Sequence, residues 1–141
     1  MYSCLTSTVL VFLFSLVKAD QINIVQPSSS SVYHANDKLS IDYNIHSMGM
    51  TRIWSTSVTL TYIDSNQTIE GFPRLPYKSS DEKKVNGTWT IPSNISNGTY
   101  YLSVAANVTY PCSESHNGKP PYKQCKDTVY QRSTFTILNS V

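Results

Sequence analysis

The sequence predicts an all-β fold, an antiparallel two-sheet β-sandwich of about seven strands. Three observations support this prediction. Apolar and polar residues alternate in several short segments, as they do in strands that are half buried against a core. Turn-forming residues separate these segments at a spacing typical of sandwiches. No window shows sustained helical periodicity, and the chain beyond its first 19 residues has the length of one domain.

The expected strands follow in chain order. The clearest is Lys38–Ile45, in which every second residue is apolar. In residues 100–108 the same alternation turns Tyr100 inward and Asn107 outward. Asn86-Gly87 and Asn97-Gly98 tolerate positive φ, so turns are expected at both places. The remaining expected strands are Ile22–Ile24, which stops at Pro27, residues 57–62, residues 89–91, which Pro92 ends, and residues 133–137.

One local pattern makes the fold prediction more specific. In Gly98-Thr99-Tyr100-Tyr101-Leu102, Tyr100 takes the place of the tyrosine corner of an immunoglobulin-like sandwich. Leu102 then stands where the second inter-sheet cysteine of an immunoglobulin domain would be. The sequence therefore predicts an immunoglobulin-like or fibronectin-III-like domain whose central pair is apolar. The alternative is that Tyr100 is an ordinary core tyrosine.

The first residues, Met1–Ala19, predict a signal peptide, which leaves a domain at residues 20–141. The apolar run Val9–Val17 is too short to span a bilayer, and Val17 and Ala19 place the cut before Asp20. A buried first strand is the alternative interpretation. No later segment reaches transmembrane length, and the tail lacks a lipid-anchor pattern. We therefore expect a secreted product without a membrane anchor, located outside the cell or in a cell wall.

Five Asn-x-Ser/Thr motifs predict N-glycosylation. Such acceptors matter only to a chain that enters the secretory lumen. Because serine and threonine are abundant, chance alone would supply about two or three of them, so they support export together with the leader. The acceptors are Asn66, Asn86, Asn94, Asn97 and Asn107.

The cysteines predict one disulfide. Cys4 leaves with the signal peptide, and Cys112 and Cys125 remain as an even pair. Their spacing does not suit a zinc site, which needs further cysteine or histidine ligands at short intervals. A bridge between them would stabilise the fold by about 3 kcal/mol, because it constrains the unfolded chain.

Composition and motifs argue against several function classes. Removal of Lys18 with the signal peptide lowers the net charge from +2 to about +1, which is too small for a nucleic-acid footprint. The carboxylates nominate no pair for glycoside hydrolysis, and His34, His46 and His116 belong to no catalytic pattern. We expect no enzyme and no cofactor. In His46-Ser47-Met48-Gly49-Met50 three soft ligands alternate, as a Cu(I) site would require, but a loop that carries these residues by accident is the commoner case.

Two sets of residues are candidates for binding. The chain is rich in tyrosine, and aromatic rings can stack on the C–H faces of sugars. Tyr101 and Tyr110 are expected at such positions, although tyrosine is also an ordinary strand residue. The second set lies in the loop that the disulfide would close, where Lys119, Tyr122 and Lys123 form a basic surface with an aromatic residue. A solvated loop without a ligand is the alternative.

The order of these segments resembles the N-terminal immunoglobulin-like domain of fungal Ser/Thr-rich, often lipid-anchored cell-wall glycoproteins and of yeast wall proteins implicated in β-1,6-glucan assembly. Two departures from that family are visible: Tyr43 stands where such domains usually carry tryptophan, and the Ser/Thr-rich stalk is missing. The matching segments are residues 22–27, 39–43, 58–60, 87–92, 97–102 and 133–137.

The resemblance implies a non-catalytic module that associates with wall polysaccharide or takes part in wall assembly, with no catalytic residues to carry over. The alternative is a soluble extracellular ligand or effector that binds a partner protein. A hydrolase is the third and weakest interpretation.

Overall fold

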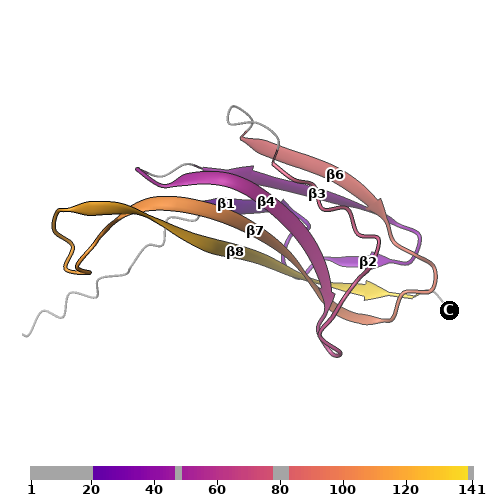
Figure 1. Ribbon diagram of the computed structural model, residues 1–141. Coiled ribbons are helices and arrows are strands. Elements are labelled where there is room, and N and C mark those ends of the chain that lie inside the picture. The colour runs from indigo at the N-terminus through magenta and orange to yellow at the C-terminus, as the bar shows by residue number, and fades with distance from the viewer. Residues whose placement is uncertain (1–20, 47–48, 78–82, 140–141) are drawn as a thin grey trace, which may run out of the picture.

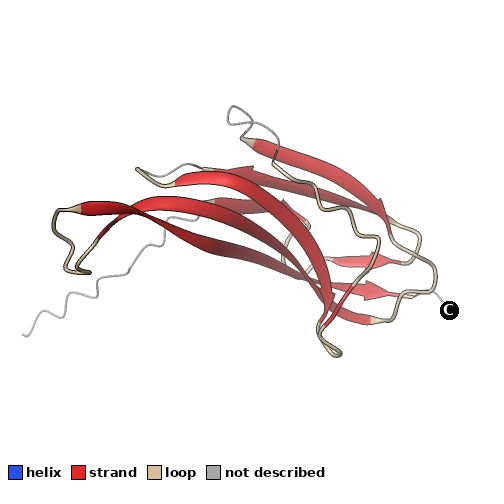
Figure 2. Ribbon diagram, in the orientation of Figure 1, coloured by secondary structure: helices blue, strands red, loops and turns tan. Residues whose placement is uncertain are grey.

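The computed structural model describes residues 21–46, 49–77 and 83–139, and these residues form an all-β fold (Figures 1 and 2). No helix occurs among them, and therefore none that is long and apolar enough to cross a membrane. The strands are β1 (Ile22–Gln26), β2 (Val32–His34), β3 (Lys38–Ile45), β4 (Arg52–Tyr62), β5 (Gln67–Thr68), β6 (Lys84–Thr90), β7 (Gly98–Ser113) and β8 (Tyr122–Leu138).

The strands form two sheets that pack face to face. One sheet has the order β1-β3-β6, and the other has the order β2-β8-β7-β4-β5. This arrangement corresponds to an immunoglobulin-like sandwich in which two short strands, β2 and β5, extend the sheet of the C, F and G strands at its two edges. All pairings are antiparallel except that of β2 with β8, which is parallel over Val32–His34. That pairing corrects the expectation of a purely antiparallel sandwich.

The core lies between the two sheets and is built by the alternation seen in the sequence. In β3 every second residue from Leu39 to Ile45 is buried, and in β7 the same holds from Tyr100 to Val108. Asn107 is exposed, as its register predicted. Residues of both sheets contribute the largest fully buried side chains, which include Tyr43, Tyr100, Phe135, Leu39, Ile41, Leu60, Ile91, Leu102 and Ile137.

Tyr100 forms the predicted tyrosine corner at the start of β7. Its hydroxyl donates a hydrogen bond of 2.6 Å to the carbonyl oxygen of Ser96, four residues upstream. Its ring lies 4.9 Å from that of Tyr62 and 6.5 Å from that of Phe135, measured between centroids. The corner therefore joins the loop after β6 to the core.

Tyr43, at the position where tryptophan was expected, anchors the long connection between β5 and β6. Its hydroxyl donates to the carbonyl oxygen of Leu75 at 2.6 Å and lies 2.7 Å from Thr56 Oγ1. Thr56 Oγ1 in turn accepts a hydrogen bond from the backbone N–H of Tyr77. A tryptophan could not make this chain of bonds, because its indole N–H only donates.

The prediction of a turn at Asn86-Gly87 is wrong. Both residues lie inside β6, where they pair with Asp42 and Ile41. Glycine is suited to this position for a different reason: a Cβ atom at Gly87 would lie 2.6 Å from the side chain of Leu75. At Asn97-Gly98 the expected positive φ does occur: Gly98, the first residue of β7, has φ of 147°. β6 also begins earlier than expected and ends one residue before Ile91.

Alkaline pH should weaken the fold through Tyr100. Burial, and to a smaller extent the neighbouring Tyr62, raises the pKa of Tyr100 from 10.0 to about 12. Its contribution is therefore complete below pH 10 and is lost as the pH rises toward about 12, because the unfolded chain ionises first. We expect the free energy of unfolding, measured by urea titration, to fall over this range, and to fall less in Tyr100→Phe.

At neutral pH, Tyr100→Phe should cost about 1 kcal/mol for the lost hydrogen bond. Val104→Ala is the control, because it weakens the same core without removing an ionisable group. An alkaline fall that is equally steep in Tyr100→Phe and in Val104→Ala would contradict the role of Tyr100.

Candidate binding surfaces

A two-stranded arm extends from the sandwich at the end of the molecule opposite the C-terminus (Figure 1). We use "arm" for residues 110–125. β4 pairs with β7 only as far as Thr109, opposite Arg52, so beyond this point β7 and β8 pair with each other alone. The predicted disulfide between Cys112 and Cys125 is confirmed, with Cα atoms 5.8 Å apart. It runs diagonally, because Cys112 is opposite Lys123 and Cys125 is opposite Tyr110.

The end of the arm is held by its own hydrogen bonds. The buried hydroxyl of Ser113 lies 2.8 Å from Asn117 Oδ1 and 2.7 Å from the carbonyl oxygen of Lys119. Asn117 Oδ1 also accepts from the backbone N–H of Lys119, and the N–H of Glu114 donates to the carbonyl oxygen of Pro121. The tip is thus an ordered turn rather than a loop held only by its bridge.

The five predicted binding residues do not form one site. Lys119 and Tyr122 lie at the tip of the arm, and the side chain of Tyr122 is 58% exposed. Lys123 follows Tyr122 in an extended strand and therefore points to the opposite face. Tyr110 lies at the base of the arm, on the face that turns toward the core. Tyr101 lies on the outer face of the sheet, under the guanidinium of Arg132 at 4.6 Å.

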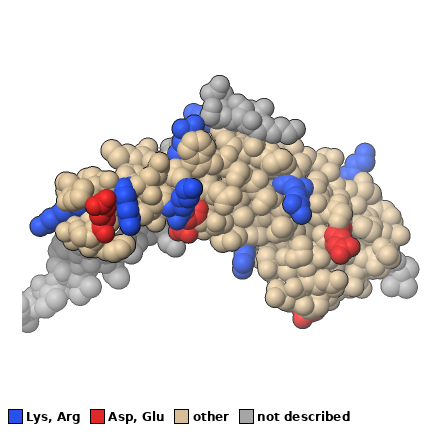
Figure 3. All heavy atoms as spheres, in the orientation of Figure 1, with Lys and Arg blue, Asp and Glu red and all other residues tan. Residues whose placement is uncertain are grey.

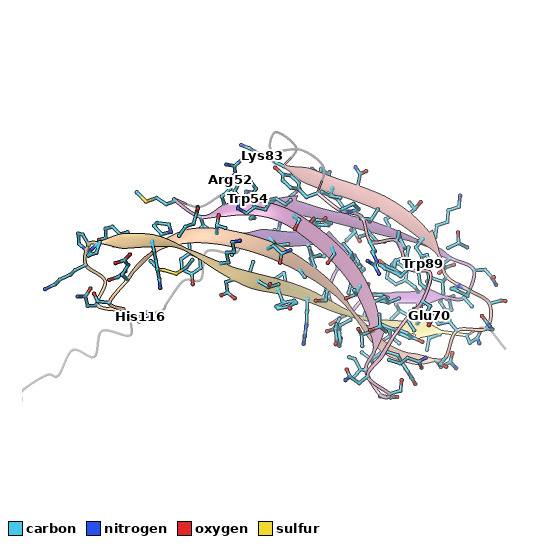
Figure 4. All side chains as sticks on the ribbon, in the orientation of Figure 1. Arg52, Trp54, Glu70, Lys83, Trp89 and His116 are labelled. Carbon is cyan, nitrogen blue, oxygen red and sulfur yellow. A yellow bond between two sulfur atoms is a disulfide. The ribbon has the colours of Figure 1, made fainter. Side chains whose placement is uncertain are left out.

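The structure reveals an exposed aromatic residue that sequence reasoning missed. Trp54 is 52% exposed on the outer face of the five-stranded sheet, close to Arg52 in Figure 4. Its indole N–H donates to Thr109 Oγ1 at 2.7 Å, and the guanidinium of Arg52 lies 3.9 Å from the ring centroid. A β-bulge between Ile53 and Ser55 turns it outward. The sequence does contain a sign of this bulge. The apolar residues Ile53 and Val58 are separated by an odd number of positions, which simple alternation does not allow, and both are buried.

Trp54 forms one wall of an open groove of about 730 Å³ at the base of the arm, which we call the Trp54 groove. In Figure 3, charged side chains of both signs lie on and near the arm, and others are scattered over the rest of the visible face. The groove is lined by Trp54, Ser55, Asn107, Val108, Thr109, Gln124, Lys126, Asp127 and Thr128.

A second groove, of about 550 Å³, follows the edge of β8 near the start of β1. It contains Tyr110, one of the predicted residues, together with Tyr130, which is 62% exposed. Beyond its pairing with β2, which involves only Thr136, Ile137 and Leu138, this edge of β8 has no partner strand among the described residues. Its other lining residues are Gln21, Ile22, Thr51, Val108, Asp127, Thr128, Val129 and Gln131.

The predicted glycan acceptors are all exposed. Asn66 lies in the turn between β4 and β5, Asn86 on β6, Asn94 and Asn97 between β6 and β7, and Asn107 on the outer face of β7. Asn97 Oδ1 accepts a hydrogen bond from the backbone N–H of Asn139. The arm contains no acceptor motif.

Histidines and carboxylates are scattered over the described residues. No group of three or more His, Cys, Asp or Glu that could hold a metal ion occurs in this part of the chain. His34 lies 3.8 Å from Asp37, and His116 lies at the tip of the arm (Figure 4). Of the three alternating soft ligands, His46 and Met50 are exposed, whereas Met48 lies outside the described residues. The predicted signal peptide also lies outside them.

Comparisons with protein-family models, with curated proteins and with solved structures find no match to this chain.

Removing the disulfide should loosen the arm and leave the sandwich folded. In the double variant Cys112→Ala/Cys125→Ala, the arm keeps mainly its hydrogen bonds, because no strand among the described residues pairs with it besides β7 and β8. We expect hydrogen exchange in residues 110–125 to become faster by up to about a hundredfold, which corresponds to the roughly 3 kcal/mol that a bridge of this span contributes.

The amides of β3 and of residues 100–106 serve as the internal control and should exchange as in the unmodified protein. Faster exchange throughout both sheets would show that the bridge supports the whole domain instead.

Proposed function

We propose that this chain is a secreted, N-glycosylated, non-catalytic module that binds polysaccharide at a fungal cell wall or in the extracellular space, with the tip of the arm as its contact surface. The observation that carries the proposal is that the arm is ordered, projects from the sandwich and contains no glycan acceptor. The N-glycans of the protein would therefore leave the arm accessible to a ligand.

The distribution of the acceptors supports this choice of surface. Asn86 decorates the three-stranded sheet, while Asn66, Asn94 and Asn97 lie in the turns next to β5 and β7. Asn107 stands at the base of the arm, before its first residue. Glycans at these positions would cover both sheets and the turns, because N-linked sugars are bulky and solvated.

The chemistry of the tip suits a sugar polymer. The exposed ring of Tyr122 can stack on the C–H face of a pyranose, and its hydroxyl is held 3.4 Å from the carbonyl oxygen of Gly118. Lys119 provides donors for hydroxyl or acidic groups at the tip, and Lys123 provides them on the opposite face of the arm. The tip has one carboxylate, Glu114, whereas a glycoside hydrolase uses two. Binding without cleavage is the better fit to these groups.

Export is supported by the disulfide, since such bridges persist in oxidising compartments. The leader-like residues Met1–Ala19 and the five acceptors agree with this route. The fungal wall enters the proposal through the resemblance to wall glycoproteins, which covers most of the domain.

A second candidate function, binding of a partner protein, is favoured by a different observation. Within the part of the chain that the structure describes, the edge of β8 along the 550 Å³ groove lacks a partner strand over most of its length. An extended peptide could add to this edge and place side chains in the groove. This alternative uses the base of the arm, whereas polysaccharide binding uses the tip.

Tyr122→Ala should strongly reduce retention on polysaccharide. A small contact surface binds weakly at each site, so the measurement is a pull-down on insoluble wall glucan and on chitin, with the bound fraction quantified. We expect the wild-type protein to be retained on at least one polymer. Tyr122→Ala should lose most of this retention, since one aromatic–sugar contact is worth about 1 kcal/mol or more.

Tyr130→Ala is the matched control, because it removes an equally exposed tyrosine from the base of the arm. Failure of the unmodified protein to bind either polymer would overturn the proposal and favour a protein partner. An equal loss in Tyr130→Ala would move the contact surface from the tip to the base.

A further inference from the structure

We infer that the Trp54 groove binds the chain's own N-glycan: the first sugars attached to Asn107 lie in the groove and stack on Trp54. The inference rests on the glycosylation that is part of the proposed function, and it is independent of what the arm binds. It assigns an occupant to a surface that would otherwise expose a tryptophan near the start of β4.

The acceptor nitrogen lies in the wall of the groove and is held there. Asn107 Nδ2 donates to Ser55 Oγ at 2.9 Å, and Asn107 Oδ1 accepts from Thr128 Oγ1 at 3.2 Å. The side chain is thus held between β4 on one side and β8 on the other. A sugar attached to this nitrogen starts from a defined position among the lining residues.

The tryptophan is oriented by the same acceptor motif. Thr109, the third residue of Asn107-Val108-Thr109, accepts the indole N–H of Trp54 at 2.7 Å. Arg52 stacks against the ring at 3.9 Å from its centroid, and 52% of the residue nevertheless remains exposed. The ring is therefore fixed on the sheet next to Asn107, with apolar surface available for a further contact.

The size and chemistry of the groove fit the core of a glycan. Its volume of about 730 Å³ falls within the range of small-molecule sites in proteins. A pyranose can place its C–H face on the indole, while its hydroxyl and acetamido groups reach Gln124, Lys126 and Asp127. This combination of an aromatic face and a polar rim is what a sugar ring requires.

Another acceptor borders a groove as well, but in a less suitable setting. Asn94 lines a space of about 210 Å³ beside Tyr62. The hydroxyl of Tyr62 already bonds to Asp64 and to the carbonyl oxygen of Asn97, and its ring packs on Tyr100. Tyr62 is therefore engaged by the fold, in contrast to Trp54.

The attachment itself follows ordinary N-glycosylation. A bond forms between Asn107 Nδ2 and the anomeric carbon of an oligosaccharide carried on a lipid diphosphate. The nitrogen loses one proton, and the lipid diphosphate leaves with the electron pair of the broken C–O bond. Because Nδ2 keeps its second hydrogen, it can still act as a donor after the sugar is attached.

The test uses the full chain secreted from a eukaryotic host, with Trp89→Phe as background so that Trp54 is the remaining tryptophan. Glycopeptide mass spectrometry measures the occupancy of Asn107, and acrylamide quenching of fluorescence measures the accessibility of Trp54. We expect Asn107 to be occupied, and we expect Asn107→Gln to increase quenching and shift the emission to longer wavelength. Asn86→Gln, which removes a sugar from the other sheet, is the control and should change neither.

A second measurement serves if Trp89→Phe does not fold. With both tryptophans present, Trp54→Ala should lower the melting temperature of the glycosylated protein by about 4 °C more than it lowers that of Asn107→Gln.

Occupied Asn107 with unchanged quenching in Asn107→Gln, or equal melting shifts in both backgrounds, would overturn the inference. An unoccupied Asn107 beside other occupied acceptors would overturn it as well, while leaving the proposed function intact. Absence of sugar at all five acceptors would remove the glycosylated part of the proposed function together with the inference, and the polysaccharide pull-down would still report on the arm.

Discussion

The two sheets differ in length, and most features of this molecule follow from that mismatch. β7 and β8 are 16 and 17 residues long, whereas β1 and β3 of the opposite sheet have 5 and 8 residues. A sheet needs a second layer to bury its apolar face, so the core ends where the opposing layer ends. Beyond Val108 the long hairpin must be stabilised by local contacts, and the covalent bridge and the hydroxyl of Ser113 provide them.

The same mismatch in length divides the molecule into a body, which is the sandwich, and the arm that projects from it. The body contains the tyrosine corner, the bonds of Tyr43 and all five glycan acceptors. The arm contributes little to the core, so its sequence is free to carry tyrosine, lysine and histidine in exposed positions. Between the two lies the bulge that turns Trp54 outward, next to the last pairing of β4 with β7. The junction is therefore where the five-stranded sheet exposes a large apolar ring and, in our proposal, where a sugar covers it.

Those parts of the fold that depend on burial were predictable from the sequence. Alternation in β3 and in residues 100–108 identified the core faces correctly, and the sequence around Tyr100 identified the tyrosine corner. The bulge in β4 and the place of Gly87 were not predicted, because each depends on a contact with a distant segment. The binding candidates were chosen by residue type, whereas the face to which each side chain points depends on strand pairing. For this reason Tyr101, Tyr110 and Tyr122 lie in three different places.

The diagonal course of the Cys112–Cys125 bridge has a consequence for the surface that the arm presents. The pairing of β7 with β8 continues without a shift from the core to the end of the arm, but burial no longer holds the alignment of the strands beyond the core. A shift by one position would exchange the two faces, so that Tyr122 and Lys123 would trade sides. The covalent link excludes this sliding, since the sulfur atoms meet in one alignment only. The bridge therefore helps to keep Tyr122 on one side of the arm and Lys123 on the other.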